Sequence, residues 1–390
     1  MEDELPLALG TAAAGPAPPP GEFIRAELEK RGWGQAELAK VIGRPLPTVN
    51  EIIQGKRAIL PEMAVALGAA FGTGALVWLQ RESAYRLSLV EQNDPETHAR
   101  ARLYGLAPVK DMERRGWIAP TRRARELDAE LCRFFRVASL EEAPRLEASA
   151  RQPGSAEEFT AAQRAWLFRA AQLAATVPAR PFEPGRFEAG LSGLRALAGA
   201  ADGVPRVPGA LAELGVRFVV VEPLPRTRLD GAAFWLREDQ PTIALSLRYD
   251  RIDWFWHTLA HELSHVRRGD RRSLDANLVG ESRVEPAGEV EARAEREGAA
   301  FLIPPERLRS FIIRTRPFYA KEKLQRFALR QGVHPGIVSG QLRHLKELGW
   351  DAHRDLLVKV RERLVRAAPT DGWGRAPLPL PPPPDAPFFP

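Results

Sequence analysis

The chain of 390 residues is 44% hydrophobic and 27% charged, the composition of a folded protein with room for two or three domains. Its single cysteine, Cys132, excludes an intrachain disulfide and a thiolate metal site. The formal net charge of +6 is mild. No stretch approaches the roughly 18 apolar residues of a membrane span, and residues 1–20 lack the basic start and apolar core of a secretory signal. We therefore expect a cytoplasmic protein with no membrane partner.

Both ends of the chain are rich in Pro, Ala and Gly. Residues 1–20 and 367–390 can bury little apolar surface, so we expect a disordered tail at each end, the second one proline-rich. Between the tails the pattern changes twice. The sequence predicts a first domain at 21–87, a connecting region at 88–204 and a third domain at 205–366 that ends in a basic helical part.

Residues 21–87 show the pattern of consecutive short helices. A tight turn at Gly43-Arg44 precedes a helix at about 45–53, and Gly55 ends that helix. A short helix, a glycine-containing turn and a second short helix with a polar outer face are typical of a helix-turn-helix. In that geometry Gln35, Lys56 and Arg57 would contact phosphates, and the residues facing the major groove would be Pro47, Thr48, Asn50 and Glu51.

Two segments carry a family resemblance here, QAELA at 35–39 and TVNEIIQGKRAI at 48–59. Together with VWLQ at 77–80 they are similar to the HigA-type antitoxins of the Cro/C1 (XRE) repressor class. The resemblance implies a lambda-repressor-like helical bundle that binds operator DNA as a homodimer and represses its own operon. Pro45 and Pro47 stand where many members of this class have serine, which removes groups that would otherwise donate to phosphate.

Residues 88–204 have a helical pattern but few chemical motifs. We expect a helical connector and packing region, with a loop at 151–155 and with its aromatic side chains in a core. Runs of β-branched and aromatic residues then predict three strands, at 216–221, 231–236 and 242–247. We expect the last of these to be a sheet edge, able to hold an extended peptide by backbone hydrogen bonds.

The stretch WFWHTLAHELSHV at 254–266 contains the pattern His-Glu-x-x-His. On a helix His261 and His265 lie one turn apart, so both imidazoles face one point, with Glu262 beside them. Two imidazoles and a third protein ligand leave one position of a zinc ion open for water, and a neighbouring carboxylate can take the proton of that water. The sequence therefore predicts a metal hydrolase helix with Zn²⁺, or alternatively another divalent metal, as its cofactor.

The third ligand must come from one of the downstream carboxylates, which are Asp270, Asp275, Glu281, Glu285, Glu289, Glu291, Glu295 and Glu297. In the predicted helix at 288–303, Glu291 heads a stripe of inward positions that continues with Ala294 and Gly298. These two small residues would let this helix approach the metal helix closely. Glu291 is the predicted ligand, with Glu295 one turn later as the alternative and an ordinary surface glutamate as the plainer interpretation. Four residues are expected on a solvated face: Glu289, Arg293, Arg296 and Glu297.

Three segments, TLAHELSH at 258–265, VEARAE at 290–295 and FLIP at 301–304, resemble the ImmA/IrrE family of metallopeptidases. The resemblance extends over about residues 22–350 to the subset fused to a HigA-type domain. It implies that the positions matching His261, His265 and Glu291 bind the metal and that the one matching Glu262 is the general base. It also implies a repressor or antitoxin as the protein substrate. Glu295 and Glu297 depart from the family pattern, which puts the local packing in doubt.

Two further histidines are candidates for the cleft. His257 lies one turn before His261 on the same face, and we expect it to be a partly exposed residue that is not a ligand. His334 is a candidate donor to a tetrahedral oxyanion, although its His-Pro-Gly turn equally indicates a helix start.

Taken together, the sequence predicts an α+β, mainly α, chain with a helix-turn-helix bundle, a helical connector and a zincin-like peptidase domain whose small sheet packs on the metal helix. The predicted function is a DNA-binding transcriptional regulator with a zinc-dependent endopeptidase that cleaves a regulatory protein. The main alternative is an antitoxin or autorepressor, paired with a cognate toxin, whose peptidase domain is not catalytic. A stand-alone peptidase without affinity for an operator is a third hypothesis.

Overall fold

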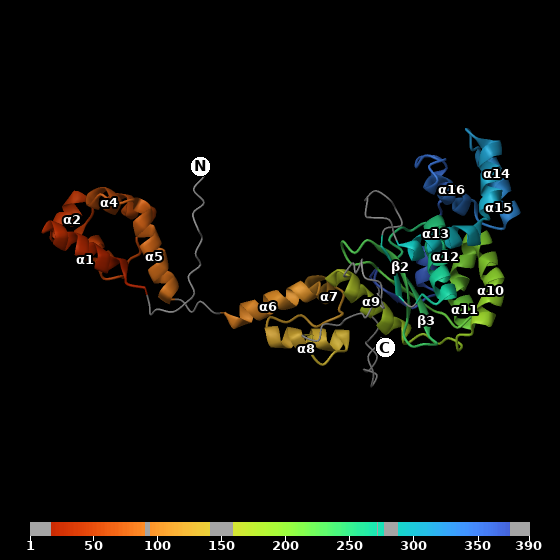
Figure 1. Cartoon of the computed structure of the whole chain (residues 1–390), viewed down its shortest axis with the longest axis horizontal. Helices are drawn as coiled ribbons and strands as arrows, with labels where there is room; N and C mark the ends of the chain where they lie inside the picture. Colours follow the sequence, from red (N-terminus) through yellow and green to blue (C-terminus); the bar gives the residue numbers. More distant parts are fainter. Residues whose placement is uncertain (1–16, 90–93, 141–158, 271, 277–287, 375–390) are drawn as a thin grey trace. The chain divides into compact units, whose positions relative to one another are not determined.

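The computed structural model of the chain describes residues 17–89, 94–140, 159–270, 272–276 and 288–374. The chain divides into two compact units, residues 1–98 and 99–390, both drawn in Figure 1. The predicted loop at 151–155 and most of the two predicted tails lie outside the described residues. No helix within the described ranges is both long and apolar enough to cross a membrane.

The first unit contains the predicted series of short helices. Their bounds are α1 (Pro20–Arg31), α2 (Gln35–Val41), α3 (Leu46–Ile53), α4 (Pro61–Phe71) and α5 (Ala75–Leu89). Proline stands in the first turn of α1, α3 and α4, where its missing N–H costs no helical hydrogen bond. Gly32 and Gly72 end α1 and α4 in the left-handed conformation, with φ of 63° and 71°. The core includes Ile24, Leu38 and Trp78, all at most 1% exposed.

The second unit is built on one mixed sheet. Its strands are β1 (Arg217–Val221), β2 (Leu229–Trp235), β3 (Pro241–Leu245), β4 (Arg272–Ala276) and β5 (Thr370–Asp371), in the order β4-β2-β3-β1-β5. β1 runs parallel to β3 and β5, whereas β2 is antiparallel to β3 and β4. The prediction that residues 242–247 form an edge strand is wrong, because β1 pairs with the free side of β3 and places it in the middle of the sheet. Residues 370–371, assigned to the tail from sequence, belong to the edge strand β5.

Alternation along the strands divides the hydrophobic core between the two faces of the sheet. On β1, Phe218 and Val220 pack with the helices α10 (Pro184–Ala196), α11 (Val207–Glu213) and α12 (Ile252–Arg268). Figure 1 shows these three helices together beside the sheet. Val219 and Val221 face the opposite way, toward α6 (Pro95–Leu106), α7 (Val109–Arg114), α8 (Ala124–Phe135) and α9 (Ala161–Ala174). Much of the region expected to be a connector therefore covers one face of the sheet.

The remaining helices extend the α12 side of the unit. They are α13 (Glu289–Leu302), α14 (Pro305–Thr315), α15 (Lys321–Gln331), α16 (Pro335–His344) and α17 (Arg361–Val365), with 3₁₀ turns at Leu197–Gly199, Ala201–Arg206 and Arg354–Leu356. The chain is thus mainly helical with a small mixed sheet, as the sequence predicts. The sheet packs on α12, the helix that carries His-Glu-x-x-His. Its assignment to the zincin-like folds stays a prediction.

A buried ion cluster attaches the C-terminal strand to the α6–α9 side of the sheet. Asp371 on β5 is 1% exposed and accepts a hydrogen bond from Arg169 Nε on α9 at 2.6 Å. The same carboxylate accepts from Arg115 Nη2 at 2.9 Å and from Trp117 Nε1 at 3.2 Å. Because Arg169 is itself only 2% exposed, the Asp371 carboxylate compensates a charge that solvent barely reaches.

We predict that Asp371→Ala lowers the free energy of unfolding of the second unit by about 3 kcal/mol, because it leaves the buried Arg169 guanidinium without its carboxylate. Urea denaturation of the whole chain, followed by tryptophan fluorescence, measures the change. Asp202→Ala is the matched control, since the Asp202 side chain is 85% exposed and its pair with Arg363 lies at the surface. Equal effects of the two substitutions would contradict the assigned role of Asp371.

Candidate metal centre and DNA-facing helix

Helix α12 positions the predicted metal residues by its amphipathic pattern. Ile252, Phe255, Trp256 and Leu259 are at most 1% exposed and hold one side of the helix in the core. Gly269 ends the helix in the left-handed conformation, with φ of 69°. The functional side chains are buried as well, with His261 at 1% and both Glu262 and His265 at 0% exposure. The predicted helix over this motif is confirmed.

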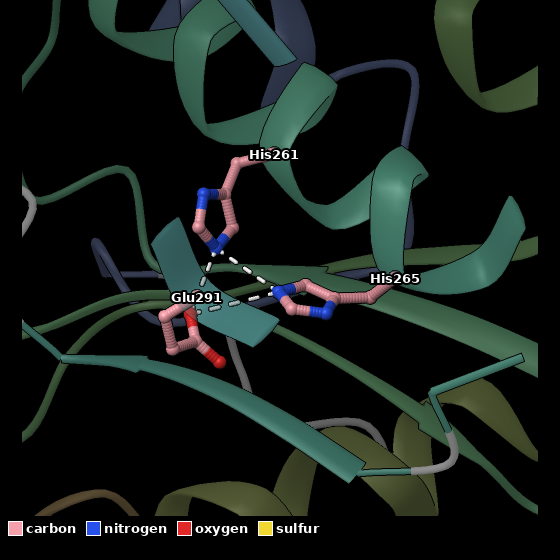
Figure 2. Close-up of side chains that lie close together, drawn as sticks. All are labelled: His261, His265 and Glu291. Atoms are coloured by element: carbon pink, nitrogen blue, oxygen red, sulfur yellow. Dashed lines mark hydrogen bonds and ion pairs between the residues drawn. The ribbon is translucent and has the colours of Figure 1, made fainter. Parts of the chain in front are cut away.

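Glu291 on α13 completes a cluster with the two histidines of α12 (Figure 2). Its Oε2 lies 3.2 Å from His261 Nε2 and 3.6 Å from His265 Nε2, and the two Nε2 atoms are 3.1 Å apart. The choice of Glu291 over the other carboxylates is therefore supported by geometry. Glu295, the alternative, approaches His261 from the opposite ring nitrogen, with 3.6 Å between its Oε2 and His261 Nδ1.

The close approach of α13 to α12 depends on the predicted small residues. Ala294 is 0% exposed, and a Cβ placed on Gly298 would lie 2.9 Å from the backbone nitrogen of His261. A side chain at 298 would therefore have to push against backbone, which cannot yield. The prediction that Ala294 and Gly298 allow the helices to meet is confirmed.

The predicted solvated face of α13 is only partly correct. Glu289 and Arg296 are exposed, but Glu297 accepts a hydrogen bond from Ser264 Oγ at 2.7 Å and pairs with Arg268. Arg293 pairs with Asp270. These polar contacts join α13 to the end of α12 and so fix where Glu291 lies relative to the two histidines. The helical periodicity of α13 alone does not reveal them.

Each metal-facing imidazole has a carboxylate on its second nitrogen. Asp270 Oδ2 lies 3.1 Å from His265 Nδ1, and Glu295 Oε2 lies 3.6 Å from His261 Nδ1. A carboxylate at Nδ1 favours the tautomer that carries its proton there, so each Nε2 keeps its lone pair for a metal. This role of Asp270 and Glu295 was not predicted from sequence. The sequence held one indication of the role of Asp270, namely that it directly follows Gly269, where the helix that carries His265 ends.

The cluster fits a divalent metal by geometry and by donor type. In a tetrahedral zinc site with bonds of roughly 2.0–2.1 Å, neighbouring ligand atoms lie roughly 3.3 Å apart. The three distances between the ligand atoms of His261, His265 and Glu291 are 3.1, 3.2 and 3.6 Å. Two imidazoles and one carboxylate are also donors that zinc accepts. The residues could therefore hold Zn²⁺ or another divalent cation with little movement.

Glu262 lies between the helix and the sheet. A Cβ on Gly231 of β2 would lie 2.7 Å from Glu262 Oε1 and 2.9 Å from Thr258 Cγ2. Glycine at 231 therefore provides the space in which the Glu262 carboxylate sits. In the sequence Glu262 directly follows His261, and both side chains are buried. A buried carboxylate next in sequence to a candidate metal ligand is a candidate proton acceptor.

His257 lies beside the cluster without belonging to it. Its Nε2 is 3.3 Å from Glu295 Oε2, and its side chain is 15% exposed, which agrees with the expectation of a partly exposed residue that is not a ligand. His344 on α16 approaches the same carboxylate, with 3.4 Å from its Nε2 to Glu295 Oε1. Burial raises the pKa of Glu295, but the facing imidazoles of His257 and His261 outweigh burial and hold this pKa well below its usual range.

His334 occupies a different place. It precedes α16, and its Nδ1 accepts a hydrogen bond from the backbone N–H of Gly336 at 3.0 Å. Burial lowers the pKa of His334, and its charged neighbour is Asp253 at the start of α12, two turns before His261. The structure brings it to the beginning of α12 and not to the metal cluster, so the helix-start interpretation describes its contacts.

The first unit presents the predicted DNA-facing residues on α2, α3 and the turn that follows. Gln35 is the first residue of α2, Pro47, Asn50 and Glu51 are exposed on α3, and Thr48 is half-buried there. Gln54 Nε2 donates to Asn50 Oδ1 at 2.7 Å. Exposed Arg57 pairs with Glu51 at 3.2 Å, next to exposed Lys56. Gly55 has φ of 73° and ends the helix, as predicted.

Residues 24–79 match the model of a helix-turn-helix family. Over 79 residues, which are 20% of this chain and 73% of the relative, the chain is 37% identical to virulence-associated protein I of Dichelobacter nodosus. The predicted helix-turn-helix is therefore confirmed.

Two solved structures are also similar to this region. One is an addiction module antidote protein of the HigA family from Coxiella burnetii, with 31% identity, a TM-score of 0.19 and coverage of 19% of this chain and 82% of that chain. The other is PA4674 from Pseudomonas aeruginosa in complex with its operator DNA, with 33% identity, a TM-score of 0.20 and coverage of 21% of this chain and 90% of that chain.

We predict that Asp270→Ala weakens zinc binding roughly tenfold to a hundredfold, because His265 loses the carboxylate that fixes its tautomer. Competition between the full-length chain and a chromophoric zinc chelator measures the affinity without requiring any enzymatic activity. Glu289→Ala on exposed α13 surface is the control and should bind zinc as the wild type does. An unchanged affinity in Asp270→Ala would show that His265 is oriented by other contacts.

Proposed function

Since the chain belongs to the helix-turn-helix family that includes virulence-associated protein I, we propose that it is a DNA-binding transcriptional regulator whose second unit is a zinc-dependent endopeptidase. Its substrate would be a regulatory protein such as a repressor or an antitoxin. The observation that carries the proposal is the convergence of His261, His265 and Glu291 beside the buried Glu262, on a chain that also contains a DNA-facing helix.

The DNA-binding half is supported by the exposed residues of α3 and of its following turn. Pro45 and Pro47 carry no N–H, so the first turn of α3 offers few backbone donors to a phosphate. Binding therefore relies on side chains, with Lys56 and Arg57 on the backbone and Asn50 in the major groove. Because one such unit supplies few phosphate contacts, we propose that operator DNA is bound by a homodimer.

In the peptidase half, His261, His265 and Glu291 would hold the metal, with Asp270 and Glu295 orienting the two imidazoles. Such a metal acidifies a bound water and polarises the carbonyl of a scissile peptide bond. Glu262 would be the group that accepts a proton from the attacking water and gives it to the leaving amine. Its burial at 0% exposure excludes bulk water from competing for this proton.

A second candidate function is an antitoxin or autorepressor whose second unit is not catalytic. The family match at residues 24–79 lies within the first unit and supports the DNA-binding part of both candidate functions equally. This alternative requires a stable complex with a cognate toxin, operator binding that is insensitive to chelators, and no proteolysis.

We predict that Glu262→Gln abolishes cleavage while the chain retains its zinc, because glutamine keeps the shape of the side chain but cannot accept the proton. Metal content of the purified full-length chain and proteolysis of the candidate regulator encoded beside its gene are the two measurements. Glu306→Gln, an exposed change on α14, serves as the control and should leave both unchanged. Cleavage that persists in Glu262→Gln would refute the proposed role of Glu262.

We predict that Arg57→Ala weakens binding to DNA from upstream of the chain's own gene and lowers the slope of log affinity against log salt by about one, as expected for the loss of one phosphate contact. Titration at several salt concentrations, with labelled DNA, measures both values. Lys30→Ala is the control, because Lys30 pairs with Glu27 on α1, outside the DNA-facing segment. Equal slopes for both variants would place the phosphate contacts elsewhere.

A further inference from the structure

A large cavity lies between α12, α13, α14 and α16 of the second unit. It encloses about 770 Å³, and its inner wall includes Leu302, Ile303, Leu308, Ile312 and Ile337. Ligand-binding pockets commonly measure roughly 300–1,000 Å³ and are predominantly apolar. The cavity is therefore large enough for several residues of a peptide, and its wall is apolar.

Apolar surface continues from the cavity to the solvent. Ile313, Leu345 and Trp350 line it and are 72%, 50% and 58% exposed. Three large apolar side chains exposed side by side around an apolar cavity mark a surface that gains free energy when covered. Isolated exposed apolar residues, such as Leu329 on α15, carry no such meaning.

The wall also contains charged residues, among them two ion pairs and three further basic side chains, Arg309, Arg343 and Lys346. Arg251 pairs with Asp253, and Arg316 pairs with Glu347. The four residues of these two ion pairs attract a charged ligand only weakly, because the ligand would have to replace an existing partner. The cavity therefore offers an apolar inner wall together with basic side chains in its lining.

The cavity comes close to the candidate metal centre through two residues that are not themselves ligands. His257 and Glu295 both line it, and Glu295 Oε2 lies 3.6 Å from His261 Nδ1. His257 precedes His261 by one helical turn, a rise of roughly 5–6 Å. A peptide bond placed at the metal would therefore leave the neighbouring residues of the same peptide within reach of the cavity.

We infer that this cavity is a specificity pocket that binds an apolar segment of the substrate polypeptide, beside the bond to be cut. The inference rests on the proposed peptidase function and adds the substrate class to it. Apolar residues flanking the scissile bond bury themselves against Ile312 and Ile313, while the backbone remains at the metal cluster. Residues with basic side chains at these positions are disfavoured, because Arg309, Arg343 and Lys346 in the lining would repel them.

Binding and cleavage can be tested separately. Full-length zinc-loaded protein carrying Glu262→Gln is titrated with two fluorescein-labelled peptides, one with a central Leu-Phe-Leu and one with Ser-Gln-Ser in its place. We expect the first peptide to bind at least about tenfold more tightly, as the burial of apolar side chains requires. Adding Ile313→Lys should remove this preference, whereas Leu329→Lys, a change at another exposed apolar residue that does not line the cavity, should preserve it.

Cleavage by the wild-type chain is then measured on a mixture of peptides from a digested proteome. Enrichment of Leu, Ile, Phe and Met beside the cut, lost in Ile313→Lys and kept in Leu329→Lys, supports the pocket. Cleavage without apolar preference, or equal binding of the two labelled peptides, overturns the pocket and leaves the peptidase standing. Selective binding with no peptide cleaved supports the pocket as a peptide-binding site and refutes the peptidase.

Discussion

The candidate metal centre depends on one contact between two helices. Helix α13 reaches α12 where Gly298 has no side chain, 2.9 Å from the His261 backbone nitrogen if a Cβ were present. This contact sets the height of Glu291 above the two histidines. A residue with a side chain at 298 would separate the helices, and the three ligand atoms would no longer lie 3.1–3.6 Å apart. The electrostatics of the centre and the position of the cavity follow from this packing constraint.

The contact between α12 and α13 also brings several carboxylates close together. Asp270, Glu291 and Glu295 all lie close to the imidazoles of His261 and His265. Arg293 pairs with Asp270, and His257 and His344 face Glu295. In a partly desolvated site the repulsion between carboxylates is several times stronger than in water. A bound dication would offset it, so metal binding and the packing of α13 on α12 should stabilise one another.

The sequence predicted those parts of the site that follow from the geometry of a single helix. His261 and His265 are one turn apart, and Glu291, Ala294 and Gly298 form one stripe, so a helical period was sufficient to select them. Asp270, Glu295 and His344 take their roles from contacts between elements, which no local period encodes. For the same reason β3 was assigned to an edge, since its parallel pairing with β1 joins segments separated by β2. The DNA-facing helix was predictable because the turn before it and the glycine that ends it are encoded by residues next to it in the sequence.

The choice between a catalytic and an inert second unit turns on Glu262. A glutamate at 0% exposure is costly for a fold, since an ionised carboxylate loses its hydration and a neutral one still needs polar partners. Apolar residues fill equivalent positions elsewhere on α12, such as Leu259 and Leu263, and would stabilise an inert scaffold better. Gly231 adds a second cost, because glycine within a strand weakens it. Both costs are explained if the carboxylate must sit beside a metal and move a proton, and neither is explained by DNA binding in the first unit.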